Sequence, residues 1–256
     1  MVKIDLNSDL GESYGAWTMG DDKGVLGAVS SANIACGYHA GDPTVMHKTV
    51  SLCAEHGVAI GAHVSYPDLV GFGRRDIACS ADEVYDYCVY QIGALDAFCR
   101  ANGTALQHVK PHGAMYNRAA KDAALADAIA RAVKDACGGE AILMGLANSE
   151  FERASERAGI RFAAEAFADR AYLSDGNLVP RSRPGAVIHD AQAAAERVVR
   201  MATEGKVASI EGDEILFRPH SICMHGDTAE AVEMARVTRG MLESAGVRIA
   251  PLREVV

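Results

Sequence analysis

The chain has 256 residues, of which 49% are hydrophobic, and a formal net charge of −9. The length suits a single β/α-barrel domain over residues 1–256, and the acidic balance argues against a nucleic-acid-binding protein, which needs a basic face. No apolar run reaches the roughly 18 residues that span a membrane, and no signal peptide is recognisable, so we expect a cytoplasmic protein without a membrane partner.

Short strand-like runs alternate with longer helix-like runs along the whole chain. The predicted strands are residues 2–6, 31–35, 58–63, 105–110, 141–146, 160–166 and 215–218. The predicted helices are residues 21–29, 43–56, 81–102, 121–137, 149–158, 191–205 and 228–245. Because alternating β and α elements imply a mostly parallel sheet, these units predict a closed or nearly closed barrel of the (β/α)7 type. A doubly wound open sheet is the alternative.

Three longer irregular stretches, residues 64–80, 167–185 and 221–227, each follow a predicted strand. In a β/α barrel, segments that follow strands lie at the rim formed by the carboxyl ends of the strands. That rim is where such barrels place their active sites. We therefore expect the functional residues of this chain at the strand ends and in these three stretches.

Polar side chains alternate at the ends of several predicted strands. They are Asp5, Asn7 and Asp9; Gly61, His63 and Ser65; His108, Lys110 and His112; Glu165 and Asp169; and Arg218 and His220. Side chains two positions apart on a strand point to the same side of the sheet. Several strands would therefore direct charged or imidazole groups into one shared opening, where an ordinary core would continue with valine, isoleucine or leucine.

Simpler interpretations compete for some of these residues. Asp5 could be a hydrogen-bonded structural carboxylate, Asp9 and Glu12 could belong to a turn, and Asp42 before Pro43 is typical of a helix N-cap. Lys110 is the strongest functional candidate, because lysine is rarely buried unless it is paired. Three histidines are expected to act beside it: His39, His63 and His112.

Several well-known sites are absent from the sequence. There is no G-x-x-x-x-G-K-[ST] phosphate-binding loop, no G-x-S-x-G nucleophile motif and no H-E-x-x-H metal motif. Asp9 with His39 and His63 could hold a divalent ion, but their spacing does not establish one. The seven cysteines are odd in number and form no C-x-x-C pair, so we expect reduced thiols.

Long motifs recur at the ends of the predicted strands. They are residues 5–12 (DLNSDLGE), 32–43 (ANIACGYHAGDP), 61–68 (GAHVSYPD), 71–75 (GFGRR), 109–117 (VKPHGAMYN), 165–172 (EAFADRAY), 178–181 (LVPR) and 222–227 (ICMHGD). In their order and content these motifs resemble the signatures of the LamB/YcsF family. The resemblance covers essentially the whole chain.

The resemblance implies a seven-stranded β/α barrel similar to the glycoside hydrolase/deacetylase type. It also implies 5-oxoprolinase activity, in which a hydrolase opens the cyclic amide C–N bond of 5-oxo-L-proline (pyroglutamate) to give L-glutamate, with ATP converted to ADP and phosphate. Two partner subunits, B and C, are implied as well. Without a phosphate-binding loop in this chain, ATP would bind to a partner or between subunits, and a divalent cation such as Mg²⁺ is a further possible requirement.

Residue chemistry suggests roles for the catalytic group. Lys110 and Arg170 would stabilise negative charge, Asp9 or His63 would act as the base for water, and His39 and His112 would orient the substrate or donate protons. Glu12 completes this group. The substrate-binding candidates are Arg74, Glu165, Asp169, Arg170, Arg181 and His225, with Arg74 or Arg181 suited to the substrate carboxylate.

Two other functions remain open at the level of sequence. One is a metal-dependent deacetylase or amidohydrolase on a similar barrel, which would need no ATP. The other is a non-catalytic regulatory subunit that binds a small acid. The dense set of titratable residues at the predicted rim disfavours the second, because binding alone needs few of them.

Overall fold

The computed structural model describes residues 1–216, 218–224 and 229–256. Its main sheet is a closed barrel of parallel strands, in which the last strand pairs with both its neighbour and the first strand. The barrel strands are β1 (Lys3–Leu10), β2 (Ser31–Ala35), β3 (Ala59–Val64), β4 (Leu106–Pro111), β5 (Ile142–Leu146), β6 (Phe162–Phe167) and β9 (Ser221–Cys223). The predicted seven-stranded β/α barrel is therefore confirmed, and the open-sheet alternative is wrong.

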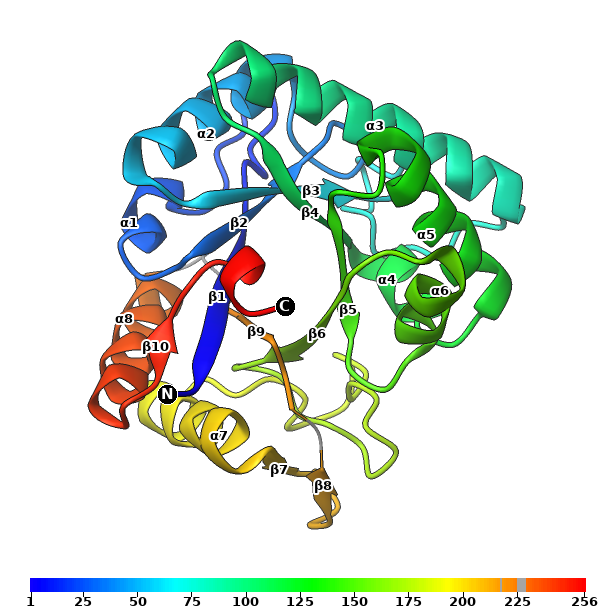
Figure 1. Cartoon of the computed structure of the whole chain (residues 1–256). Helices are drawn as coiled ribbons and strands as arrows, with labels where there is room; N and C mark the ends of the chain where they lie inside the picture. The colour runs from blue at the N-terminus through cyan, green and yellow to red at the C-terminus, as the bar shows by residue number, and fades with distance from the viewer. Residues whose placement is uncertain (217, 225–228) are drawn as a thin grey trace.

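The helices form a ring around the strands, as Figure 1 shows in a view along the barrel axis. They are α1 (Asp22–Leu26), α2 (Pro43–His56), α3 (Ala81–Ala101), α4 (Gly113–Ala119), α5 (Ala123–Cys137), α6 (Glu150–Ala158), α7 (Ala191–Glu204) and α8 (Ala229–Ser244). Among the described residues, no helix combines the length and apolarity needed to cross a bilayer. All seven cysteines are free thiols in this structure.

Local sequence signals explain where the helices begin and end. The Asp42 carboxylate accepts hydrogen bonds from the backbone amides of Thr44 and Val45, with Pro43 in the first helical turn. Ser80 and Glu83 form a reciprocal capping box at the start of α3. Gly57 ends α2 with φ at 67°, a left-handed conformation that glycine adopts without steric cost. These caps fix the lengths of the segments that bring each strand back to the same rim.

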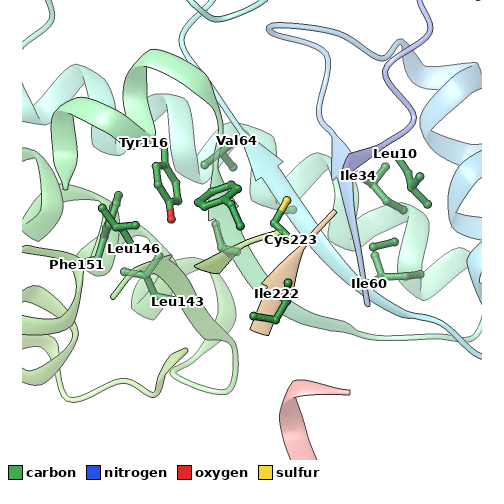
Figure 2. Packing of buried hydrophobic residues seen from close by; sticks show 14 of the residues in the cluster. Leu10, Ile34, Ile60, Val64, Tyr116, Leu143, Leu146, Phe151, Ile222 and Cys223 are labelled. Atoms are coloured by element: carbon green, nitrogen blue, oxygen red, sulfur yellow. The ribbon is translucent and has the colours of Figure 1, made fainter. Parts of the chain in front are cut away.

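The main hydrophobic core lies between the outer face of the barrel and the helices. Figure 2 shows two parts of it, one around Leu10, Ile34 and Ile60 and another around Leu143 and Phe151. Gly145 on β5 leaves room for α6, because a Cβ atom at this position would lie 2.5 Å from the Phe151 ring. The apolar packing is thus outside the strands, which leaves part of the barrel interior for polar groups.

The C-terminal segment closes the barrel at the amino ends of its strands. Strand β10 (Arg248–Ile249) pairs with β1, and the short helix η1 (Leu252–Glu254) follows it. Leu252 packs in a separate apolar cluster with Ile142, Met144 and Ala163. The Arg253 guanidinium donates a hydrogen bond of 2.8 Å to the Leu106 carbonyl. Figure 1 shows this segment across the barrel opening, so access to the interior is from the opposite end.

The prediction of the last barrel strand was wrong. Glu214–Leu216 is strand β8 of a separate two-stranded antiparallel sheet with β7 (Lys206–Ala208), whereas the barrel is completed by β9. Consequently His220 precedes its barrel strand instead of following it, and it lies away from the rim, as does Arg218. The apolar run around Ile215 produced the stronger strand pattern, because β9 has only three residues.

Two further boundaries differ from the prediction. Strand β1 continues to Leu10 rather than ending at Leu6, so Asp9 belongs to the strand and not to a turn. A short helix, α4, follows β4 directly. The Pro111 and Gly113 that flank its start are typical turn residues, which explains why the sequence pattern did not indicate a helix there.

Candidate active site

The interior of the barrel is polar along strands β1 to β4. Asn33 on β2 donates hydrogen bonds to Asn7 (2.7 Å) and Asp9 (2.8 Å) on β1. His108 on β4 reaches across to the Asn33 side-chain oxygen at 2.7 Å. Gly61 on β3 makes this crossing possible, because its Cβ atom would lie 2.0 Å from the His108 ring. Burial, followed by the charge of Lys110, lowers the pKa of His108 to about 3, so this ring is neutral.

Lys110 is the centre of the polar interior near the rim. Its side chain is buried, and its ammonium group lies 3.0 Å from the Asp9 carboxylate and 2.8 Å from the Glu165 carboxylate. It also lies 3.2 Å from the Cys223 sulfur. Burial alone lowers the pKa of Lys110, but the nearby carboxylates outweigh burial and raise it well above its usual range. Because burial also raises the pKa of Cys223, that group is a neutral thiol, and Lys110 is a cation held by two carboxylates.

Glu165 forms an ion pair with Lys110 and is itself fully buried. Besides Lys110, it accepts hydrogen bonds from the Tyr116 hydroxyl at 2.8 Å and from the Asn7 amide at 3.2 Å. Burial and the Glu165 charge raise the pKa of Tyr116 well above its usual range. The phenol therefore stays protonated, and its hydroxyl donates the hydrogen bond to Glu165. Glu165 was predicted to bind substrate, but it lies beneath the cavity and its contacts position Lys110.

Two histidines extend the network from Asp9. His63 Nε2 lies 3.2 Å from Asp9 Oδ2 and 3.0 Å from His112 Nδ1. His63 Nδ1 lies 2.9 Å from the Lys110 carbonyl oxygen, and His112 Nε2 lies 2.9 Å from the Phe72 carbonyl oxygen. Each ring is therefore fixed by a backbone carbonyl on one side, and the two remaining nitrogens face each other.

His39 and Glu12 complete this cluster. The His39 ring stacks on the His112 ring with centroids 3.9 Å apart, and its Nε2 lies 3.1 Å from Glu12 Oε1. Burial lowers the pKa of both His39 and His112 well below the usual range, with repulsion from a second imidazole as the next cause in each case. The Glu12–His39–His63–His112 cluster, as we call these four residues, thus joins loops after β1 and β2 to strand β3 and the end of β4.

The segment after β3 packs closely over the cluster. Phe72 has φ at 54°, which is uncommon for a residue other than glycine, and its carbonyl is the group that His112 contacts. Gly73 is also left-handed at 63°, and a Cβ atom there would lie 2.8 Å from the His112 ring and 2.9 Å from His39. Glycine is therefore required at this position, and the Gly71-Phe72-Gly73 turn holds the stacked rings in place.

A cavity of about 470 Å³ opens above Lys110, within the range of about 300–1,000 Å³ that is usual for small-molecule sites. Asp9, Glu12, His63, Lys110 and His112 line it. Three predicted arginines line its outer part: Arg74, Arg170 and Arg181. Burial, followed by repulsion from Arg181, lowers the pKa of Arg170. The cavity combines a cationic outer part with a carboxylate–imidazole floor.

The remaining predicted residues are placed as follows. Arg170 donates hydrogen bonds to the Val179 and Ala186 carbonyls, so it also holds the segment after β6. Asp169 is buried near Arg170 and is not among the described residues that line the cavity. His225 lies outside the described residues. Sequence reasoning missed Tyr116, although its place one helical turn beyond His112 gave a usable signal.

Comparison with known proteins identifies the family of this chain. The sequence profile of the LamB/YcsF family matches residues 4–256. The chain belongs to the LamB/YcsF family. Among its LamB/YcsF relatives, the 5-oxoprolinase A subunit of Bacillus subtilis is 53% identical over 254 residues, which cover 99% of this chain and 98% of the relative. The 5-oxoprolinase A subunit of Tolumonas auensis is 51% identical over 249 residues, which cover 97% of this chain and 99% of that relative.

Solved structures show the same architecture for this LamB/YcsF chain. The lactam utilization protein of Thermus thermophilus superposes with a TM-score of 0.92 at 49% identity, over 97% of this chain and 99% of that chain. A putative cellobiose-phosphate cleavage protein of Enterococcus faecalis superposes with a TM-score of 0.62 at 14% identity, over 100% of this chain and 99% of that one. The second likeness concerns the fold alone.

Proposed function

We propose that this chain is the lactam-opening subunit of an ATP-dependent 5-oxoprolinase, which converts 5-oxo-L-proline to L-glutamate. The substrate assignment rests on the 53% identity to a 5-oxoprolinase A subunit along nearly the full length of both chains. The cavity supports the same assignment, because it offers cations for a small carboxylic acid and a polar floor for attack on an amide. The relatives are named as subunits, which supports a multi-subunit complex with partners B and C.

The cations of the cavity suit the charges of the reaction. Arg74 or Arg181 binds the carboxylate of 5-oxoproline, because a guanidinium fork pairs well with a carboxylate. Lys110 lies deeper, and it stabilises the negative charge that develops on the lactam oxygen. Asp9 and Glu165 fix its ammonium group within 3.0 Å of each carboxylate, so the charge is oriented before substrate binds.

The floor of the cavity provides the groups that activate water. His63 and Asp9 lie 3.2 Å apart and act as one hydrogen-bonded unit. Asp9 also accepts hydrogen bonds from Lys110 and Asn33, so it is held as an anion next to the attacking water. Once ATP has phosphorylated the lactam oxygen, attack of water on the ring carbon, cleavage of the C–N bond and protonation of the nitrogen give the open γ-glutamyl phosphate. A second water then releases phosphate and leaves L-glutamate.

ATP supplies the activation that an unstrained amide needs, by phosphorylation of the lactam oxygen. The chain has no phosphate-binding loop, so we place the nucleotide on a partner subunit or at the junction with one. Arg74 and Arg181 are both exposed, and their position at the outer part of the cavity suits contact with phosphoryl oxygens from that side. Turnover is thus a property of the whole complex.

The assignment is tested by reconstitution. The chain is mixed with its B and C partners, 5-oxoproline and ATP, and glutamate and ADP are both measured while each component is omitted in turn. We expect both products only in the complete mixture. Glutamate formation in the absence of this chain, or full turnover by this chain alone, would contradict the proposal.

The histidine cluster favours one second candidate, an amide hydrolase that depends on a metal ion and not on ATP. Three imidazoles and a carboxylate around one point are a suitable donor set for such chemistry. The two candidates differ in the nucleotide. The second predicts glutamate without ATP, no ADP, and loss of activity after treatment with a chelator.

A further inference from the structure

The ring nitrogens of His63 and His112 have conflicting hydrogen-bonding roles. His63 Nδ1 and His112 Nε2 each lie 2.9 Å from a backbone carbonyl oxygen, which can only accept a hydrogen bond. Both of these nitrogens therefore carry the ring proton, and a neutral imidazole has only one. The other two nitrogens, His63 Nε2 and His112 Nδ1, are left as acceptors although they lie 3.0 Å apart. Two lone pairs at this distance repel unless a cation lies beside them.

Further electron-rich atoms surround the same point. One ligand-type atom each of Glu12, His39, His63 and His112 lies within 4.8 Å of all the others. Atoms bound to a common ion at about 2.1 Å are separated by about 3–4 Å, so only small adjustments would be needed. Asp9 Oδ2 lies 3.2 Å from the same His63 nitrogen. A single proton would relieve one pair of these atoms, whereas a metal ion would satisfy the whole set.

The outer contacts of the His63 and His112 rings match those of metal-binding histidines. Such histidines almost always donate the second ring N–H to a carboxylate or a backbone carbonyl, which fixes the tautomer and the ring orientation. Here the Lys110 and Phe72 carbonyls have this role. The Phe72 backbone adopts a left-handed conformation that an aromatic residue rarely adopts, and this conformation directs its carbonyl to His112. The rings are thus held with their free nitrogens directed inward.

We propose that Glu12, His39, His63 and His112 form a binding site for one divalent ion of the zinc class. Imidazole donors suit Zn²⁺, Co²⁺ and Fe²⁺, whereas Mg²⁺ prefers oxygen ligands, so a nitrogen-rich set disfavours magnesium. The site borders the cavity above Lys110, where an ion acts as a Lewis acid toward water or a carbonyl oxygen. The proposal rests on donor geometry and does not depend on the lactam substrate.

The test measures metal binding by the full chain without substrate or ATP. The purified protein is treated with a chelator, then titrated with Zn²⁺ or Co²⁺, with bound metal determined by mass spectrometry and Co²⁺ also by its visible absorption. We expect one ion per chain. His112→Gln removes a direct ligand and should weaken binding by at least about 100-fold, because loss of an outer contact alone costs about 10–100-fold. The exposed His47 provides a control, and His47→Gln should bind like the wild type.

Two additions keep the test decisive if His112→Gln does not fold. Glu12→Gln changes only the charge of a side chain that is 12% exposed, and it should still weaken binding by at least about 10-fold. In the wild type, ¹⁵N NMR should show that Zn²⁺ shifts the inner nitrogens of His63 and His112. Three results would each overturn the inference: no stoichiometric binding, equal binding by the variants and the wild type, or ¹⁵N signals of a doubly protonated His63 ring that do not change when Zn²⁺ is added. Failure of the glutamate assay would leave the metal result unaffected.

Discussion

Replacing Lys110 by methionine tests the charge arrangement at the centre of the barrel. Methionine keeps most of the volume, but it removes the cation that lies 3.0 Å from Asp9 and 2.8 Å from Glu165. Two carboxylates, one of them fully buried, would then face each other without compensation. Removing one partner from a buried ion pair costs about 3–5 kcal/mol. For a domain of this size that corresponds to a fall in melting temperature of roughly 6–20 °C, at about 2–4 °C per kcal/mol.

The assay is urea unfolding followed by far-UV circular dichroism. Lys48→Met provides the matched control, because Lys48 is exposed on α2, and its unfolding free energy should change by no more than about 0.5 kcal/mol. An unfolding free energy within about 1 kcal/mol of the wild type at pH 7 would refute the reasoning.

Two further predictions concern the barrel interior. Burial raises the pKa of Asp5 to about 6 from 3.8, so its contribution to stability is complete below about pH 4 and is lost as pH rises through 6. The unfolding free energy of Asp5→Asn relative to the wild type should therefore rise by about 2–3 kcal/mol from pH 4 to pH 7, and a constant difference would contradict this. Gly61→Ala would place a methyl group 2.0 Å from the His108 ring and should destabilise the protein by about 1–3 kcal/mol, measured in the same way. Wild-type stability of this variant would show that His108 does not need the space.

The sequence was sufficient to predict the barrel, because its strands and helices alternate with clear helix caps. It also predicted the residues of the cavity floor, since Asp9, His63 and Lys110 share the inward parity of their strands. Strand β9 escaped prediction because three residues are too few to establish a period. The apolar Ile215 segment gave a stronger signal, although it belongs to the small antiparallel sheet.

The arrangement of the site could not be predicted from spacing in the sequence. His39 lies in the loop after β2, yet its ring stacks on His112 at the end of β4, a contact that depends on the closed barrel. The role of Glu165 depends on how deeply its side chain lies in the barrel. It lies beneath the cavity, so it pairs with Lys110 and does not contact a ligand in the cavity. Such layers follow from the stagger of neighbouring strands, which local patterns do not encode.

The most direct test of the account is the turnover of the reconstituted complex with a single change at the cavity floor. Asp9→Asn keeps the shape of the side chain but removes the carboxylate that contacts both Lys110 and His63. Glutamate formation should fall by at least about 100-fold, as expected for loss of a group that acts in water attack, while Asp86→Asn on the exposed face of α3 leaves it unchanged. Near-wild-type glutamate formation by Asp9→Asn would contradict the assignment of this cavity as the reaction site.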